Sequence, residues 1–418
     1  MNVLSLLTRP SAPTAERPRA TLSRIAIGVG LLILLLASVR VVSGADDLTS
    51  SGSMSAALRF AAPLVLAGLG GLWAERAGVI NIGLEGMMVI GTWFGAWAGY
   101  QWGPVVGVLA AIVAGAVFGL IHALATVTFG VDQVMSGLAL NLLAAGIARY
   151  LSKLFFNGIP GGTATKSPPV DPFPAFTVPG LSEFLRGIES QHWFLIGDVA
   201  GILGGLVTEI SILTIVVIIL VLLTHYVFWH NRFGLRVRSS GENPWAADSL
   251  GIDVTRIRYI ALVISGALAG MGGAFLVTVS SSVYNEGQVA GRGFIGLATV
   301  VFGNWRPLPL GGGALLFGFT DAVSTRQPST VHAFLLVVVV ALIAIAVLQL
   351  RKRRLVTGLI ALSTGAVFLI WYVTTERLPE EIVAFAPHVI TLVVLAAASQ
   401  RLRPPASEAI PFRRGDGH

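Results

Sequence analysis

Long apolar segments without charged residues recur along this chain and decide what it can fold into. Two of them, 210–228 and 331–350, contain no Asp, Glu, Lys or Arg. A helix needs about 20 mostly apolar residues to cross the hydrocarbon core of a bilayer. Only 12% of all residues are charged, about half the share found in soluble domains. This composition disfavours a soluble enzyme, a disordered regulator and a nucleic-acid-binding domain.

The apolar segments predict an all-α fold, a polytopic membrane helical bundle of about 10–12 transmembrane helices. Segment 79–100 is weak because Gly residues and Glu85 interrupt it, and 292–325 is broken at Pro307 and Pro309. The expected spans lie near 22–43, 57–75, 79–100, 103–127, 133–155, 209–229, 258–279, 292–304, 308–325, 331–350, 355–374 and 384–400.

Basic residues gather on alternate connections between these spans. The N-terminal segment, the 230–258 loop, the 351–354 run, the C-terminal tail, Arg76 and Arg306 hold 19 of the 28 Lys and Arg residues. Because cytoplasmic loops carry the excess of Lys and Arg, both termini are expected in the cytoplasm and the number of spans is even. The net charge of +7 is then a topology signal and does not indicate binding to nucleic acid.

Small residues and a weak internal similarity indicate how the helices pack. Segment 76–83 resembles 291–298, with Gly78 aligned to Gly293 at an offset of 215 residues. Five spans separate the two segments, which therefore run in opposite directions, as in inverted repeats whose interrupted helices line a substrate path. Ridges that allow close helix approach are expected at Gly91, Gly95 and Gly99, at Gly107, Ala111, Gly115 and Gly119, and at Gly266 and Gly270.

Two loops are long enough to have functions of their own. The external loop 156–208 contains six prolines, and it is either a cap for an external partner or a plain connection. In the cytoplasmic loop 230–258, Asn243 and Pro244 predict a helix start, and Gly251 predicts its end. Such a short helix is not stable alone. With no segment of its own chain expected to contact it, it either docks on a partner or belongs to a purely structural loop.

Three motifs resemble those of a known family. They read AERAGVINIGLEGMM at 74–88, GENP followed by AA and GI at 241–252, and AGRGFI followed by FGNW at 290–305. They resemble permease subunits of ATP-binding cassette importers for nucleosides and simple sugars, within the branched-chain amino acid and ribose permease superfamily. The resemblance covers about 55–330 and resumes at 384–412.

The resemblance implies a transport subunit, not an enzyme, in a bacterial plasma (inner) membrane. An extracytoplasmic binding lipoprotein would deliver the substrate, and a second, different permease would complete the path. Cytoplasmic ATPase subunits would bind ATP and Mg, so this chain would bind no cofactor itself. The residues implied to couple to the ATPase are Gly241, Glu242, Asn243, Pro244, Ala246, Ala247 and Gly251.

The same resemblance suggests how the chain is divided. Residues 1–50 look like an added cytoplasmic N-terminus and first helix, and 51–350 correspond to the permease core. Residues 351–383 look like an inserted helix and loop, and 384–418 form the last helix and the cytoplasmic tail.

The chain shows no catalytic constellation and no metal-ligand spacing. The nearest approach to a phosphate-binding loop, 161–167, has Thr165 where Gly is required and is followed by Pro168 and Pro169, which prevent the helix start. Six polar or aromatic residues are candidates for the substrate path, because they can bond to or stack on a nucleoside or line a polar cavity. They are Asn81, Glu85, Trp93, Gln133, Asn141 and Tyr284.

Nucleoside import driven by ATP is the leading hypothesis from the sequence. The same machine could carry a monosaccharide or a branched-chain amino acid. An ion-coupled secondary transporter is an alternative of another class, favoured by the inverted repeat but not by the 241–252 segment. A membrane enzyme is disfavoured because no reactive cluster is found.

Overall fold

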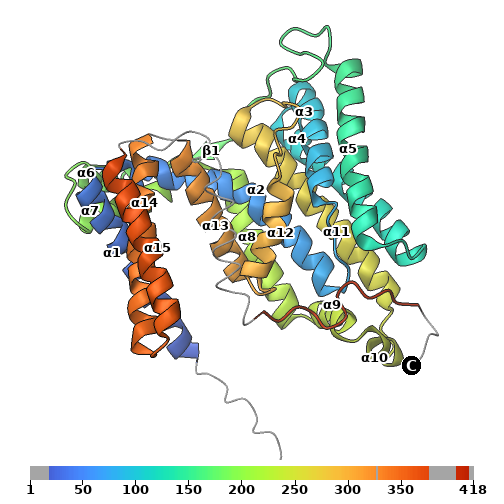
Figure 1. Ribbon diagram of the computed structural model, residues 1–418. Helices are drawn as coiled ribbons and strands as arrows, with labels where there is room; N and C mark the ends of the chain where they lie inside the picture. Colours follow the sequence, from blue (N-terminus) through green and yellow to red (C-terminus); the bar gives the residue numbers. More distant parts are fainter. Residues whose placement is uncertain (1–17, 326–327, 376–401, 414–418) are drawn as a thin grey trace, which may run out of the picture.

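The computed structural model describes residues 18–325, 328–375 and 402–413 (Figure 1), and the expected span 384–400 lies outside them. Short segments add the 3₁₀ turn η2 (Asp46–Thr49), the π-helical turns η3 (Leu124–Thr128) and η4 (Leu276–Ser281), and the antiparallel pair β1 (Ala175–Phe176) and β2 (Ile210–Ser211). The helices are α1 (Pro18–Ser43), α2 (Ser51–Arg76), α3 (Leu84–Trp102), α4 (Pro104–Ala123), α5 (Gln133–Phe155), α6 (Leu181–Glu189), α7 (Ile196–Gly205), α8 (Ile212–His230), α9 (Arg232–Glu242), α10 (Pro244–Ser249), α11 (Val254–Phe275), α12 (Arg292–Phe302), α13 (Pro307–Ser324), α14 (Pro328–Arg351) and α15 (Leu355–Thr374).

Eleven of the expected spans fall within the described residues, and each contains a helix. Two of them are interrupted. The span expected at 79–100 becomes helical only at Leu84, because Gly78 adopts a φ of +90° and the chain is not helical through 83. Helix α12 has 11 residues, about 16 Å at 1.5 Å per residue, which is too short to cross a bilayer.

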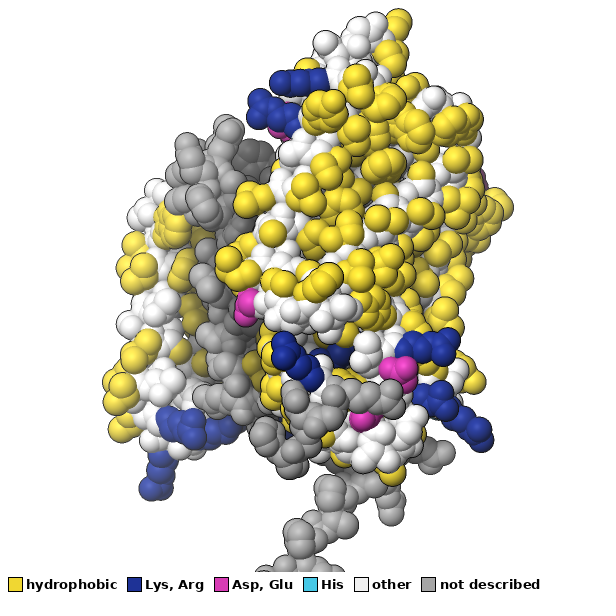
Figure 2. Space-filling view, turned by 90° about the vertical axis from the view of Figure 1, so that its right-hand side faces the viewer, with side chains coloured by type: hydrophobic (Ala, Val, Ile, Leu, Met, Phe, Trp, Pro, Cys, Tyr) yellow, Lys and Arg dark blue, Asp and Glu magenta, His cyan; other side chains and the backbone are white. Residues whose placement is uncertain are grey.

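Seven helices of the described residues are long and apolar enough to cross a membrane. Large hydrophobic side chains on their outer faces are exposed, such as Leu109 and Val113 on α4 and Leu142 on α5. Figure 2 shows this side as a broad apolar surface with Lys and Arg near its upper and lower edges. A face of this kind is stable in contact with lipid, so the chain is a multi-pass membrane protein.

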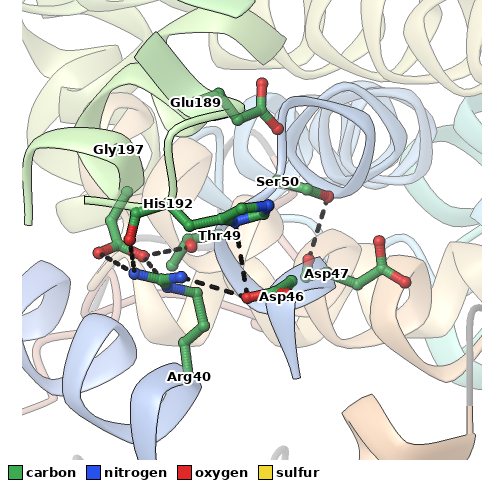
Figure 3. Close-up of a pocket in the computed structure, with 9 residues that line it drawn as sticks. Arg40, Asp46, Asp47, Thr49, Ser50, Glu189, His192 and Gly197 are labelled. Atoms are coloured by element: carbon green, nitrogen blue, oxygen red, sulfur yellow. Dashed lines mark hydrogen bonds and ion pairs between the residues drawn. The ribbon is translucent and has the colours of Figure 1, made fainter. Parts of the chain in front are cut away.

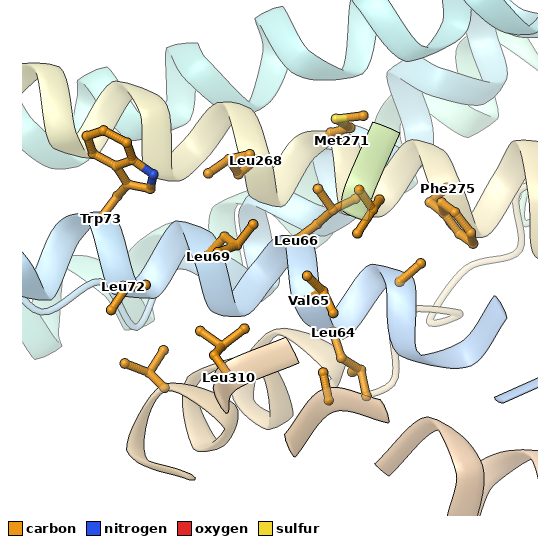
Figure 4. Packing of buried hydrophobic residues seen from close by; sticks show 14 of the residues in the cluster. Leu64, Val65, Leu66, Leu69, Leu72, Trp73, Leu268, Met271, Phe275 and Leu310 are labelled. Carbon is orange, nitrogen blue, oxygen red and sulfur yellow. The ribbon is translucent and has the colours of Figure 1, made fainter. Parts of the chain in front are cut away.

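Two sets of three helices pack crosswise. Helix α4, third in the set α2–α3–α4, packs along α11, and α13, third in the set α11–α12–α13, packs along α2. Helices α2 and α11 lie side by side and run in opposite directions (Figure 4). This reciprocal arrangement agrees with the inverted repeat predicted from the sequence. The apolar core between them includes Leu66, Leu69 and Trp73 of α2, with Leu268 and Met271 of α11.

Glycines bring the backbones of α4 and α11 into direct contact, as the predicted ridges require. A β-carbon on Gly266 would lie 2.9 Å from the Cα atom of Gly119 and still closer to the carbonyl oxygen of Gly115. Gly270 faces Ala111 and Gly115 in the same way. Association of membrane helices depends on such close packing, because no hydrophobic force acts between them in lipid.

We expect Gly266→Val to destabilise this helix pair by about 1–3 kcal/mol, since the added methyl groups overfill a packed contact. The matched control is Gly146→Val on α5, where no atom lies within 4 Å of the added carbon. Both variants place Val in a membrane helix, so an equal fall of the melting temperature in detergent would contradict the assigned contact.

The loop 156–208, which is expected to be external, is folded onto α1 and the start of α2 (Figure 3). Arg40 of α1 pairs with the buried Asp198 of α7 at 2.7 Å, and Asp198 also accepts a hydrogen bond from Thr49 at 2.5 Å. Glu189 of α6 accepts the backbone N–H of Ser51 at 2.8 Å. These groups line a polar pocket of about 180 Å³. These contacts hold the loop against the bundle, and its role as a cap for an external partner stays a prediction.

Candidate functional site

Helices α3 and α12 begin beside one another, and Glu85 joins their N-terminal ends. Its Oε1 accepts the backbone N–H of Gly291 at 2.8 Å, and its Oε2 accepts that of Gly293 at 2.7 Å. The first N–H groups of a helix have no partner within the helix and attract negative charge. Only glycine fits at position 293, because a β-carbon there would lie 2.6 Å from the Cα atom of Glu85.

Gln133 and Asn141 of α5 bind the non-helical segment that precedes α3. Gln133 Oε1 accepts the N–H of Ile80 at 2.7 Å. Asn141 accepts the N–H of Gly86 at 2.7 Å and donates to the carbonyl of Ile82 at 3.1 Å. Irregular backbone at membrane depth is tolerated only where its polar groups are satisfied inside the protein, and these two side chains satisfy it here.

Asn81 completes the same arrangement from within the segment. Its Oδ1 accepts the N–H of Gly83 at 3.0 Å, and its Nδ2 donates to Ser265 Oγ of α11 at 2.9 Å. His122 of α4, which is fully buried, lies 3.1 Å from the carbonyl oxygen of Ile80. The structure therefore brings together four of the predicted path residues, namely Asn81, Glu85, Gln133 and Asn141.

The other two predicted path residues, Trp93 and Tyr284, lie in a separate aromatic cluster. The indole N–H of Trp93 donates to Ser152 at 3.0 Å, and its ring stacks on Phe156 with centroids 5.3 Å apart. Tyr284 is 2% exposed and lies against the same Phe156. In this structure both rings pack inside the protein, where their faces are covered by neighbouring side chains.

The short helix predicted at 243–251 is present as α10. The side chain of Asn243 accepts the N–H of Ala246 at 3.0 Å, Pro244 occupies the first turn, and Gly251 has a φ of +81°. Leu250, at the tip of the turn after α10, is 82% exposed. An exposed leucine at the end of a capped helix is the kind of group that enters a pocket on a partner.

The expectation that no segment of the chain contacts this helix is wrong. Ala247 is 2% exposed because it packs against Val254 of α11 and Phe412 of the C-terminal segment 402–413. Phe412 is 158 residues beyond Val254 in the sequence, so no local pattern reveals the contact.

Helix α9, which was not predicted from the sequence, contacts the start of the non-helical segment that precedes α3. Ser240 Oγ donates to the carbonyl of Ala77 at 3.1 Å, and Gly241 lies directly against the carbonyl of Arg76. Glu242 pairs with Arg76 at 3.7 Å. The end of α9 that leads into α10 is therefore in contact with the residues that lead toward α3.

Arg76 extends this contact to the end of α12. Its guanidinium donates to the carbonyl of Trp305 at 2.6 Å and 3.0 Å, and the indole N–H of Trp305 donates to Glu75 at 2.5 Å. Glu408 of the C-terminal segment lies near these charges, and burial raises its pKa to about 7 while Arg76 opposes the shift. Both interrupted segments thus connect to the end of the bundle that carries α10.

No group of three or more His, Asp or Glu side chains within the described ranges could hold a metal ion. The hydrogen-bonded groups instead hold backbone segments in place.

Comparisons with known proteins identify the family of the chain. The family described as branched-chain amino acid transport system / permease component matches residues 53–345. The chain is 39% identical over 277 residues to the guanosine ABC transporter permease protein NupQ of Bacillus subtilis, covering 64% of this chain and 80% of the relative.

Two further relatives have different printed substrates. The chain is 34% identical to the nucleoside ABC transporter permease protein NupC of Lactococcus lactis subsp. cremoris, covering 64% of this chain and 80% of the relative. It is 33% identical to the protein named putative glucose ABC transporter permease protein TsgC13 of Haloferax volcanii, covering 67% of this chain and 79% of the relative. No solved structure shows a significant match. The chain belongs to the family of branched-chain amino acid transport system permease components.

Proposed function

We propose that this chain is the transmembrane permease subunit of an ATP-driven importer that carries nucleosides across a bacterial plasma membrane. The observation that carries the proposal is the contact of α9 with residues 76–78, which joins the exposed helix α10 to the interrupted segment before α3. The termini and α10 lie in the cytoplasm, as the distribution of Lys and Arg indicates. ATP and Mg are bound by separate ATPase subunits.

In this mechanism the ATPase acts on α10, and residues 241–251 form the coupling segment. A displacement of α10 moves Ser240 and Gly241, which contact Ala77 and Arg76. Because Arg76 also binds Trp305, the displacement reaches both interrupted helices together. Between transport cycles, hydrogen bonds keep these segments attached to the bundle beside the substrate path. The residues that make these bonds are Asn81, Glu85, Gln133 and Asn141.

Nucleosides are favoured as the substrate because two of the reported relatives carry guanosine or nucleoside in their names, at 39% and 34% identity. Glucose is the second candidate, supported by the relative at 33% identity, which is close to the 34% of the second nucleoside relative. A binding lipoprotein delivers the substrate at the face that carries α6 and α7, and a second, different permease subunit completes the path. An ion-coupled transporter working alone would not require an exposed helix with the contacts of α10.

The test is uptake by right-side-out membrane vesicles that contain the assembled importer. With ATP supplied inside, we expect labelled guanosine to accumulate and labelled glucose to stay at the level of empty vesicles. Uptake that follows a proton or sodium gradient after ATP depletion would overturn the ATP-driven mechanism. Uptake of glucose alone would retain the mechanism and replace the substrate.

A further inference from the structure

The C-terminal segment 402–413 crosses the α10 end of the bundle and contacts four separate elements. Figure 1 shows it as the red segment that runs beneath α9 toward α10. The N–H of Arg403 donates to Asn304 Oδ1, beyond the end of α12, at 2.8 Å. Ser407 donates its N–H to the carbonyl of Gly241 at 2.9 Å and its hydroxyl to the carbonyl of Glu242 at 3.1 Å.

The far end of the segment covers the inner side of α10. Phe412 is 8% exposed and packs in one cluster with Ala247 and Val254, and its ring lies 6.0 Å from that of Trp245. Arg258 of α11 donates to the carbonyl of Ile410 at 3.2 Å, and its guanidinium lies 5.9 Å from the ring of Phe412. The segment is thus fixed by hydrogen bonds at Arg403, Ser407 and Ile410, which lead up to the contact of Phe412 with α10.

Helix α10 depends on such contacts for its order. It has six residues, and isolated helices shorter than about 12 residues are marginal in water. The cluster that holds its buried face comprises Ala247, Val254 and Phe412, with Trp245 and Ile252 packed against it. Phe412 contributes a large ring to this small cluster, so its removal leaves α10 held mainly by its two chain connections and Val254.

We propose that residues 402–413 form a strap that holds α10 in its docking position, so that the ATPase subunit binds a surface built from both segments. This inference rests on the proposed function. The strap places Ile410, 40% exposed, on the same end as Leu250, 82% exposed. Two exposed apolar side chains at this arginine-rich end of the bundle favour binding to a pocket on a protein partner.

The charges around this surface indicate the chemistry of the partner. Arg256, Arg403 and Arg413 are exposed near α10 and the strap, and the acids beside them include the exposed Glu242 and Asp253. A surface with charges of both signs associates best with a partner whose charges complement it. The strap therefore predicts an ATPase groove that is apolar at its centre and carries complementary charges of both signs at its margin.

The proposal is tested with Phe412→Ala in the assembled importer. We expect about tenfold weaker retention of the ATPase, because an α10 that is no longer held must be ordered when it binds. ATP hydrolysis at saturating ATPase should change little, since the docking groups themselves are intact. Phe412→Trp should restore retention, and Phe176→Ala, a truncation of an exposed ring on the external strand β1, is the matched control.

A labelling experiment separates loss of position from general unfolding. The chain contains no cysteine, so Ala247→Cys provides a single thiol at a site that is 2% exposed. Phe412→Ala should make maleimide labelling of this thiol faster, while Phe176→Ala should not. If Phe412→Ala does not accumulate in the membrane, Phe412→Leu gives a milder loss of the same contact.

The outcomes distinguish the strap from the proposed function. The strap is overturned if Phe412→Ala leaves ATPase retention unchanged, whether or not maleimide labelling becomes faster. This conclusion requires that Leu250→Asp, measured in parallel, still abolishes retention. If Leu250→Asp also leaves retention unchanged, α10 is not the docking element and the strap's role in docking fails with it. The proposed function itself fails only if uptake follows an ion gradient after ATP depletion.

Discussion

We expect Leu250→Asp to abolish ATP-driven uptake while the chain still folds and inserts. Leu250 is 82% exposed and closes the turn after α10, so an aspartate there disturbs no internal packing. At an interface, a leucine buried in a pocket is the kind of central contact whose loss costs 2 kcal/mol or more, roughly a 30-fold weaker complex. A buried carboxylate without a partner adds a desolvation cost.

The measurement is co-purification of the ATPase with the tagged permease, followed by uptake in vesicles. Leu181→Asp on α6 is the matched control, because Leu181 is also exposed, at 45%, but lies in the 156–208 loop. It should leave ATPase retention unchanged. Retention of the ATPase by Leu250→Asp at the wild-type level would show that α10 is not its docking element.

Glu85→Ala has the second large expected effect, on both stability and transport. The variant removes the acceptors of the Gly291 and Gly293 N–H groups. Each buried donor left without a partner costs about 1–3 kcal/mol, so the start of α12 loses two contacts at once. We expect a clear fall of the melting temperature in detergent, with uptake reduced more than the amount of folded protein.

Glu85→Gln is the graded partner of this variant. Its amide oxygen can accept one of the two N–H groups, but its NH₂ group cannot accept the other. We therefore expect a stability between those of the wild type and Glu85→Ala. Glu183→Gln on the exposed face of α6 is the control for the change of charge. Equal stability of wild type and Glu85→Ala would contradict a bridging role for this carboxylate.

The sequence predicted most of the membrane helices because apolar length is a local property. Segments such as 212–230 and 330–351 are long and apolar enough to form helices wherever they pack. Helix α10 was also predictable, because its cap at Asn243 and its end at Gly251 depend on neighbouring residues. The sequence also identified 79–100 as a weak span, and in the structure its helix α3 begins only at Leu84.

The contacts that form the site depend on residues far apart in the chain. Glu85 and Gly291 are separated by 206 positions, and a carboxylate in an apolar span indicates a polar neighbour without saying which one. Phe412 and the strap were missed for the same reason, because a single aromatic residue in a proline-containing tail has no pattern. The roles of Gln133 as an acceptor and of Asn141 as a donor to the non-helical segment could be seen only once the helices were packed.

The crosswise packing of the two repeats decides which parts of the protein can move as units. The close glycine contact between α4 and α11 leaves no space for one helix to slide over the other. Helix α13 is joined to α2 in the corresponding way. The moving bodies are therefore not the first and second halves of the sequence. Because α2 also packs directly against α11, the four helices form one packed unit with two helices from either half, and the halves cannot separate without breaking it.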